Sequence, residues 1–194
     1  MSVRCMIPYD SGTFFITFTN TRWLPLFELT NGYDLVYKFF DELRKQGHYV
    51  NAYVIMPNHV HMIVSFTRTS KSINTIIGNG KRIMGYELVK RLEARGHTDI
   101  LNKMSKWVSP RDRKKGRKHE VFEPSFDWKY LDYDKILYQK LDYIHANPCN
   151  CTPALVSDSV LYPNSSAGFY IGEGLNRACW LSCRRSKFKE ALKG

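Results

Sequence analysis

Acidic residues are under-represented in this chain of 194 residues. Asp and Glu number 18 against 29 Lys and Arg, and the formal net charge is +11. A surplus of positive charge this large indicates a polyanionic partner, most often a nucleic acid. The alternative is that the charge only keeps the protein in solution.

Long apolar runs are also missing. No stretch approaches the roughly 18 consecutive apolar residues of a membrane span. The first ten residues, MSVRCMIPYD, lack the apolar run of a signal peptide. We therefore expect a cytoplasmic protein.

Cysteines are few and odd in number: Cys5, Cys149, Cys151, Cys179 and Cys183. An odd count in a cytoplasmic chain argues against a disulfide framework. The two close pairs could form a structural zinc site, although one residue between Cys149 and Cys151 is shorter than the usual spacing. Reduced structural thiols are the favoured interpretation.

Two common catalytic signatures are absent. The segment GNGK at 78–81 does not extend to the GxxxxGK[ST] pattern of a phosphate-binding loop. No triad built on a nucleophilic Ser or Cys is recognisable either. Any chemistry must therefore depend on other residues.

The apolar pattern predicts an α+β fold. Alternating apolar residues predict strands, and apolar residues three and four apart predict helices. The order β-α-β-β-α-β-α matches a ferredoxin-like (RRM-like) fold, an antiparallel sheet with helices on one face. The predicted strands are 13–19, 50–56, 59–66 and a short strand or extended segment at 121–129; the predicted helices are 33–46, 72–95 with an interruption near 78–80, 132–147 ended by Pro148, and a short terminal one at 182–193; 22–27 and 97–120 are predicted loops.

Two histidines lie on the predicted third strand. Because side chains alternate along a strand, His59 and His61 share one face and Val60 points to the other. Two neighbouring imidazoles can chelate one divalent ion, since a neutral imidazole nitrogen is a good metal ligand. The alternative is a pair of surface or half-buried histidines that bind no metal.

A tyrosine and an asparagine share one face near the end of the last long helix. Tyr143 and Asn147 are four residues apart, so their side chains project on the same side. A phenol attacks a phosphodiester only with activation or charge relief, which a divalent ion held by two His and one Asn could supply. Tyr143 could instead be a core or rim aromatic. Tyr133 and Tyr138 are rival nucleophiles, and of the two only Tyr138 is followed at the same spacing by a possible oxygen ligand, Asp142.

The segments around these residues resemble a known family. Residues 52–65 (AYVIMPNHVHMIVS) and 140–148 (KLDYIHANP) together resemble the REP-associated tyrosine transposases, which are IS200-like HUH single-tyrosine transposases. Residues 13–27 resemble the opening strand and loop of that family, and 162–170 (YPNSSAGFY) resemble its Ser-Ser-Ala segment. The likeness spans residues 8–175.

The resemblance implies a DNA-nicking and strand-transfer enzyme that acts on single-stranded, hairpin-containing DNA of palindromic repeats. Tyr143 would form a 5′-phosphotyrosine link and free a 3′-hydroxyl. His59, His61 and Asn147 would bind Mg²⁺ or Mn²⁺.

The resemblance also bears on organisation. It implies a monomer that acts in cis rather than a homodimer, in the nucleoid of a bacterium. One HUH transposase-like catalytic domain, 1–175, would include a basic arm at 105–120 and precede a basic C-terminal tail at 176–194. The chain departs from the family after YIHANP, where it reads CNCTPALV, and at Asn164, which replaces an aromatic residue. These departures bear on which hairpin is recognised.

Basic side chains outside this site are candidates for DNA contacts. The segment RDRKKGRK at 111–118 is typical of an arm that neutralises backbone phosphates, or of a solvated loop without a partner. Trp107 and Trp128 flank it and could stack unpaired bases or only pack. The candidate DNA-binding residues are Lys81, Arg82, Arg111, Arg113, Lys114, Lys115, Arg117, Lys118, Arg184 and Arg185.

Two other functions fit the same sequence. A non-catalytic binder of structured DNA or RNA would use the sheet and the basic arm without nicking. A metal-dependent hydrolase would use the His pair with water as its nucleophile, and it would not need Tyr143.

Overall fold

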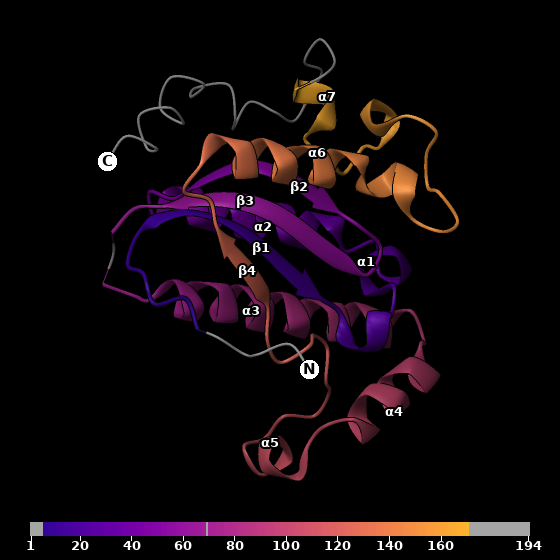
Figure 1. Ribbon diagram of the computed structural model, residues 1–194. Helices are drawn as coiled ribbons and strands as arrows, with labels where there is room; N and C mark the ends of the chain where they lie inside the picture. The colour runs from indigo at the N-terminus through magenta and orange to yellow at the C-terminus, as the bar shows by residue number, and fades with distance from the viewer. Residues whose placement is uncertain (1–5, 69, 171–194) are drawn as a thin grey trace.

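A four-stranded antiparallel sheet organises residues 6–68 and 70–170, which are the residues that this computed structural model describes (Figure 1). The strand order is β2-β3-β1-β4. This order and the element sequence confirm the α+β, ferredoxin-like prediction. The strands are β1 (Gly12–Thr19), β2 (Tyr49–Ile55), β3 (His59–Phe66) and β4 (Asp127–Tyr130).

Two helices cover one face of the sheet. They are α2 (Tyr33–Lys45) and α3 (Ile73–Ala94). Phe40 of α2 and Ile77 of α3 join Phe14 and Met62 of the central strands in the larger hydrophobic core. Burial of such side chains, at about 25 cal/mol per Å² of apolar surface, fixes both helices to the sheet.

The last long helix, α6 (Asp134–Asn150), covers the opposite face (Figure 1). Its Leu137 and Ile144 pack with Phe15 and Val54 in a second, smaller core. The prediction of helices on one face therefore holds for α2 and α3, whereas α6 lies on the other. Because each strand alternates its side chains, the residues that face α6 are those between the ones that face α2 and α3.

The predicted interruption of the second helix is wrong, since α3 continues through Gly78 and Gly80. Gly80 lies directly against the ring of Phe39, and a Cβ there would come within 2.3 Å of Phe39 Cε2. The glycine therefore serves close packing of α3 on α2 rather than a break in the helix.

The segment 97–120 is not a loop as predicted. It contains α4 (Thr98–Lys106) and α5 (Pro110–Lys114). Leu101 and Met104 of α4 are buried. The Ser109 hydroxyl accepts a hydrogen bond from the Asp112 amide at 3.1 Å, and Pro110 at the first helical position suits the start of α5.

Other boundaries differ in smaller ways. The predicted loop 22–27 overlaps the 3-10 turn η1 (Thr21–Trp23) and the start of α1 (Leu26–Leu29). The helix α6 continues past Pro148, whose missing N–H falls in the last turn. The turn η2 (Ser159–Leu161) and the short α7 (Ala167–Tyr170) follow. The predicted tail at 176–194 and helix at 182–193 lie outside the described residues.

None of the helices within the described ranges has the length and apolar character needed to cross a membrane.

Candidate active site

Both histidines of the H-x-H pair face α6 from the central strand β3. His59 and His61 are 8% and 6% exposed, and their ring centroids lie 4.6 Å apart. Alternation along the strand explains the shared face, as the sequence predicts. The pair is therefore close enough for both rings to bind one ion.

Each imidazole is held by a hydrogen bond on its Nδ1 atom. His61 Nδ1 lies 2.6 Å from Thr17 Oγ1, and His59 Nδ1 lies 2.6 Å from Asn58 Oδ1. An amide oxygen only accepts, so Nδ1 of His59 must carry the proton and Nε2 must carry the lone pair. This arrangement is typical of metal-binding histidines, whose outer nitrogen is oriented by a second hydrogen bond.

Burial also keeps both rings neutral. It lowers the pKa of His59 to about 4, and the nearby Asn147 side chain opposes this shift. Burial, followed by the charges of His59 and Lys140, lowers the pKa of His61 to about 3. Neutral imidazoles at physiological pH are the form that binds metal ions.

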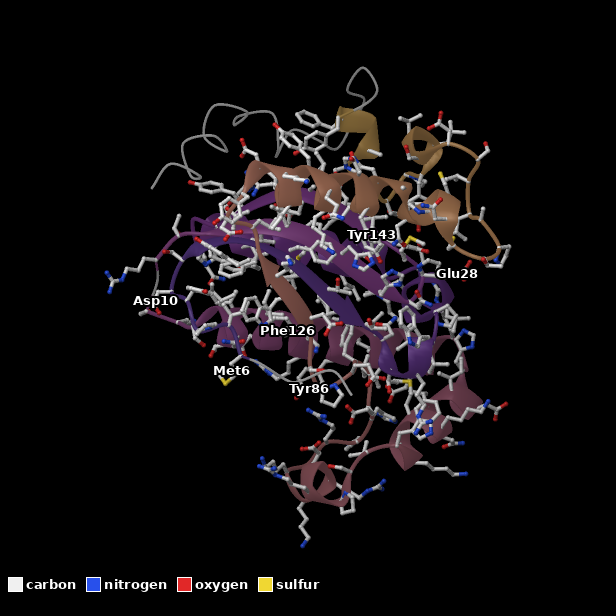
Figure 2. The ribbon with its side chains drawn as sticks, in the orientation of Figure 1. Met6, Asp10, Glu28, Tyr86, Phe126 and Tyr143 are labelled. Atoms are coloured by element: carbon white, nitrogen blue, oxygen red, sulfur yellow. The ribbon has the colours of Figure 1, made fainter. Side chains whose placement is uncertain are left out.

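Two residues of α6 meet this pair. The Tyr143 ring centroid lies 5.1 Å from that of His61, and Tyr143 is 48% exposed (Figure 2). One turn later, the Asn147 side chain lies close enough to His59 to influence its pKa. The predicted face shared by Tyr143 and Asn147 is thus the face that lies over the histidines.

A lysine of α6 lies over the rings of Tyr143 and Phe15. Lys140 Nζ is 4.5 Å from the ring centroid of Phe15 and 5.2 Å from that of Tyr143. Phe15 in turn stacks on His61 at 5.5 Å. A cation at this position would stabilise negative charge that develops on the Tyr143 oxygen.

The rival tyrosines lie apart from the histidines. Tyr133 and Tyr138 are 67% and 57% exposed. Within residues 6–68 and 70–170, neither ring contacts His59 or His61. The geometry therefore favours Tyr143 among the three candidates.

The site can hold a divalent ion only with the help of an amide. Within the described part of the chain, no group of three His, Cys, Asp or Glu side chains is placed to bind a metal. Asn147, beside His59, carries a neutral amide oxygen that could serve as a third ligand. Cys149 and Cys151 are free thiols.

Sequence reasoning missed several residues around the site. Thr17 could be found only from the strand pairing, in which it is the register partner of His61. Trp23, in the predicted loop, is 62% exposed, and its ring centroid lies 5.4 Å from that of His59. Asn58 precedes His59 directly, and its turn position gave no sign of a role.

Lys81 requires a correction. It is 8% exposed, and its Nζ donates hydrogen bonds to the carbonyl oxygens of Glu123 at 2.7 Å and Ser125 at 2.9 Å. Burial lowers the pKa of the amine to about 8. Lys81 therefore anchors the segment before β4 and is not part of an exposed DNA-binding surface. Arg82, its neighbour, is exposed.

The basic arm divides into two groups. Arg113 donates to the Ser105 carbonyl at 2.7 Å, and Arg117 pairs with Asp112 at 3.4 Å and Glu120 at 3.1 Å. All six basic side chains of 111–118 are exposed, but among the described residues Arg111, Lys114, Lys115 and Lys118 form no salt bridge. The helices α4 and α5 lie beyond α3, on the side away from α6 (Figure 1). Arg184 and Arg185 lie outside the described residues.

The two tryptophans that flank the arm take part in packing. The guanidinium carbon of Arg22 lies 4.8 Å from the ring centroid of Trp107. Trp128 makes edge contacts with Tyr9 and Phe14 at 6.3 and 6.0 Å. These contacts favour the packing interpretation over base stacking for both residues.

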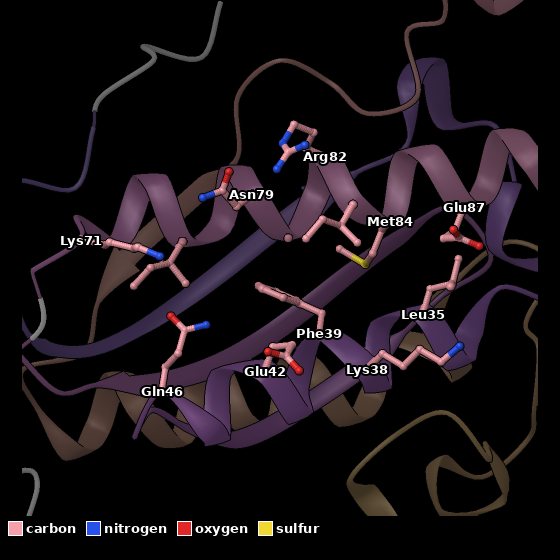
Figure 3. Close-up of a pocket in the computed structure, with 13 residues that line it drawn as sticks. Leu35, Lys38, Phe39, Glu42, Gln46, Lys71, Asn79, Arg82, Met84 and Glu87 are labelled. Carbon is pink, nitrogen blue, oxygen red and sulfur yellow. The ribbon is translucent and has the colours of Figure 1, made fainter.

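A cavity of about 580 Å³ lies away from the histidines, between α2 and α3 (Figure 3). Phe39 lies at its base, Lys38 and Glu42 line it from α2, and Arg82 and Glu87 line it from α3. Its mixed charges and distance from the His pair separate it from the candidate active site.

Comparisons with known proteins bear on the fold. No protein-family model matches the chain, and no curated protein is similar to it in sequence. The chain is similar to the solved structure of a REP-associated tyrosine transposase bound to a REP hairpin, with a TM-score of 0.58 and 19% identity over 93% of this chain and 91% of that one. It is also similar to a candidate transposase from Deinococcus radiodurans, with a TM-score of 0.42 and 15% identity over 74% of this chain and 95% of that one. The first likeness shows that this chain has the fold of the hairpin-bound transposase.

Proposed function

We propose that the protein is a metal-dependent tyrosine endonuclease and transposase of the REP-associated, HUH single-tyrosine type, which acts on hairpin-containing single-stranded DNA. One observation carries the proposal. Tyr143 lies against His61 while Asn147, one helical turn later, lies beside His59 in the same chain. The shared fold with a hairpin-bound transposase and the net charge of +11 support it.

His59, His61 and Asn147 would hold Mg²⁺ or Mn²⁺ through imidazole nitrogens and an amide oxygen. The fit is supported by the hydrogen bonds on Nδ1 of both rings, which leave Nε2 for a ligand. A divalent ion bound there would relieve the negative charge on a phosphoryl oxygen. Because the two imidazoles and the amide are neutral, they would leave the positive charge of the ion, and hence its electrophilic character, undiminished.

The Tyr143 phenolic oxygen then attacks the scissile phosphorus. A bond forms between Tyr143 Oη and phosphorus as the bond from phosphorus to the 3′-oxygen breaks. The electron pair leaves with the 3′-oxygen, which takes up a proton, and the phenolic proton passes to solvent. Because the phosphotyrosine keeps the energy of the broken diester, a later attack by a 3′-hydroxyl rejoins the strands without ATP.

The exposure of Tyr143 suits this role. A side chain that is 48% exposed beside the His pair can be reached by a flexible DNA strand. The Tyr143 side chain meets the histidines of its own chain, which favours a monomer that acts in cis.

A covalent adduct tests the proposal. The protein is incubated with Mn²⁺ and a series of DNA hairpins that carry single-stranded flanks, and protein–DNA adducts are resolved by denaturing electrophoresis. We expect an adduct that Tyr143→Phe abolishes and the control Tyr138→Phe retains. Binding without an adduct on every hairpin would support the non-catalytic binder. Cleavage that survives Tyr143→Phe but not His59→Ala would support the hydrolase that uses water.

A further inference from the structure

An exposed indole borders the candidate metal site. Trp23 is 62% exposed, and its ring makes an edge contact with His59, with 5.4 Å between centroids. Large aromatic side chains usually bury most of their surface, so an exposed indole beside a reaction centre is a natural surface for stacking. Its position, on the turn η1, leaves the remaining ring surface open to solvent.

The backbone holds Trp23 in an unusual conformation. Arg22 and Trp23 have φ values of 48° and 59°, a left-handed region that residues with side chains rarely adopt. Asn58 holds both ends of this turn. Its main-chain carbonyl accepts a hydrogen bond from the Asn20 main-chain N–H at 2.8 Å, and its side-chain Nδ2 donates to the Trp23 carbonyl at 3.3 Å. The same Asn58 accepts from His59 Nδ1. One side chain thus sets the position of both the indole and the imidazole.

Contacts of the neighbouring Arg22 strengthen the turn. Its amide donates to Glu123 Oε1 at 2.9 Å, and its guanidinium lies over Trp107. Trp107 is therefore covered by the protein itself, whereas Trp23 keeps its exposed indole beside the histidines. A turn fixed at several points can present this ring at a constant distance from the metal site.

We propose that Trp23 is the platform on which an unpaired base next to the scissile phosphate stacks, specifically the base of the nucleotide whose 3′-oxygen leaves. The inference rests on the proposed function. Trp23 borders His59, whereas Tyr143 borders His61. An in-line displacement places the leaving oxygen opposite the nucleophile, and therefore toward the His59 side. Stacking on an aromatic ring accepts any base, so the platform positions the strand without reading its sequence.

Fluorescence of a base analogue tests the platform without cleavage. In a Tyr143→Phe background, 2-aminopurine is placed either at the leaving nucleotide or at its neighbour across the scissile phosphate. We expect stronger quenching at the leaving nucleotide, loss of that difference in Trp23→Gly, and retention of most of it in Trp23→Phe. Tyr86→Ala is the matched control, because Tyr86 is 65% exposed on α3, which covers the opposite face of the sheet.

Trp23→Gly separates a stacking role from a structural one. Glycine adopts a positive φ without strain, so this variant should unfold at the same temperature as wild type or higher. Its affinity for the hairpin should nevertheless fall roughly 5- to 150-fold, as expected for one lost base stack. Unchanged affinity and quenching, or a loss of affinity that merely follows a loss of stability, would overturn the inference. If wild type forms no adduct with any hairpin while Trp23→Gly still loses affinity without losing stability, the nicking function fails and Trp23 remains a stacking platform for an unpaired base.

Discussion

Thr17 and His61 face each other across the β1–β3 pair, and the Thr17 hydroxyl lies 2.6 Å from Nδ1 of His61. The contact orients the imidazole from the side opposite to Nε2. Groups in this outer position commonly influence metal affinity almost as strongly as the ligands themselves.

Replacing Thr17 with Val should therefore weaken metal binding. The variant keeps the shape of the side chain but removes the hydrogen bond to Nδ1, and we expect Mn²⁺ affinity without DNA to fall roughly 10- to 100-fold. Thr17→Ser retains the hydroxyl and should bind Mn²⁺ like wild type. Calorimetric titration with Mn²⁺ measures both, and equal affinity for Thr17→Val would show that the hydroxyl does not orient His61.

Lys140 should accelerate the nicking step rather than DNA binding. Its Nζ lies 5.2 Å from the Tyr143 ring centroid, where a positive charge favours the developing phenolate. We expect Lys140→Met to slow single-turnover adduct formation roughly 5- to 30-fold, in line with about 1–2 kcal/mol of lost stabilisation. Lys140→Arg should recover part of the rate. Lys135→Met, at an exposed lysine on the same helix, is the control; an equal effect of both variants would point to general charge instead.

Local patterns predicted much of this site. The alternation around Val60 placed both histidines on one face, and the four-residue spacing placed Tyr143 with Asn147, because both rules depend only on neighbours along the chain. The structure agrees on both points. That α6 covers the face of the sheet opposite to α2 and α3 depends on packing between distant segments, which no local pattern contains.

The errors have the same origin. Gly80 looked like a helix break because glycine is a poor helix former, but contact with Phe39 decides its role. Lys81 looked exposed because most lysines are, whereas the carbonyls of Glu123 and Ser125 bind its amine. Each partner lies far away in the sequence.

Two glycines of α3 should respond oppositely to alanine. A Cβ at Gly80 would come within 2.3 Å of the Phe39 ring, whereas nothing lies within 4 Å of a Cβ at Gly78. We expect Gly80→Ala to lower the free energy of unfolding by about 1–3 kcal/mol through overpacking. Gly78→Ala should raise it by about 0.5–1 kcal/mol, because alanine favours the helix. Urea denaturation of the two variants checks this, and stabilisation by both would mean that the Phe39 ring moves aside freely.

The buried amine of Lys81 should make stability depend on pH. Its pKa is about 8 in the folded protein against an ordinary 10.5, so between these values the unfolded chain binds more protons. The stability that Lys81 contributes therefore rises as the pH increases through this window, by up to about 3 kcal/mol, and is lost as the pH falls.

Lys81→Met isolates that contribution. At pH 7 the variant should be less stable by about 2 kcal/mol, because two carbonyl oxygens lose their donor. The gap between wild type and Lys81→Met should widen from pH 8 to pH 10, while Lys90→Met, at an exposed lysine of α3, should show no such trend. Guanidinium denaturation across this range provides the measurement, and a constant gap would mean that the folded pKa is not lowered.

The exposed cations of the basic arm should control how salt affects DNA binding. Each neutralised phosphate contributes about 0.9 to the slope of log affinity against log salt concentration on duplex DNA. Arg111, Lys114, Lys115 and Lys118 are exposed, and changing all four to Gln should lower the slope for a hairpin stem by up to about 3–4. Arg117→Gln should change the slope less, because Asp112 and Glu120 already pair with this guanidinium. Binding titrations at several salt concentrations separate the two groups. A slope unchanged by the fourfold replacement would show that the arm contacts no phosphate, and the DNA would then have to bind entirely on the α6 side of the sheet.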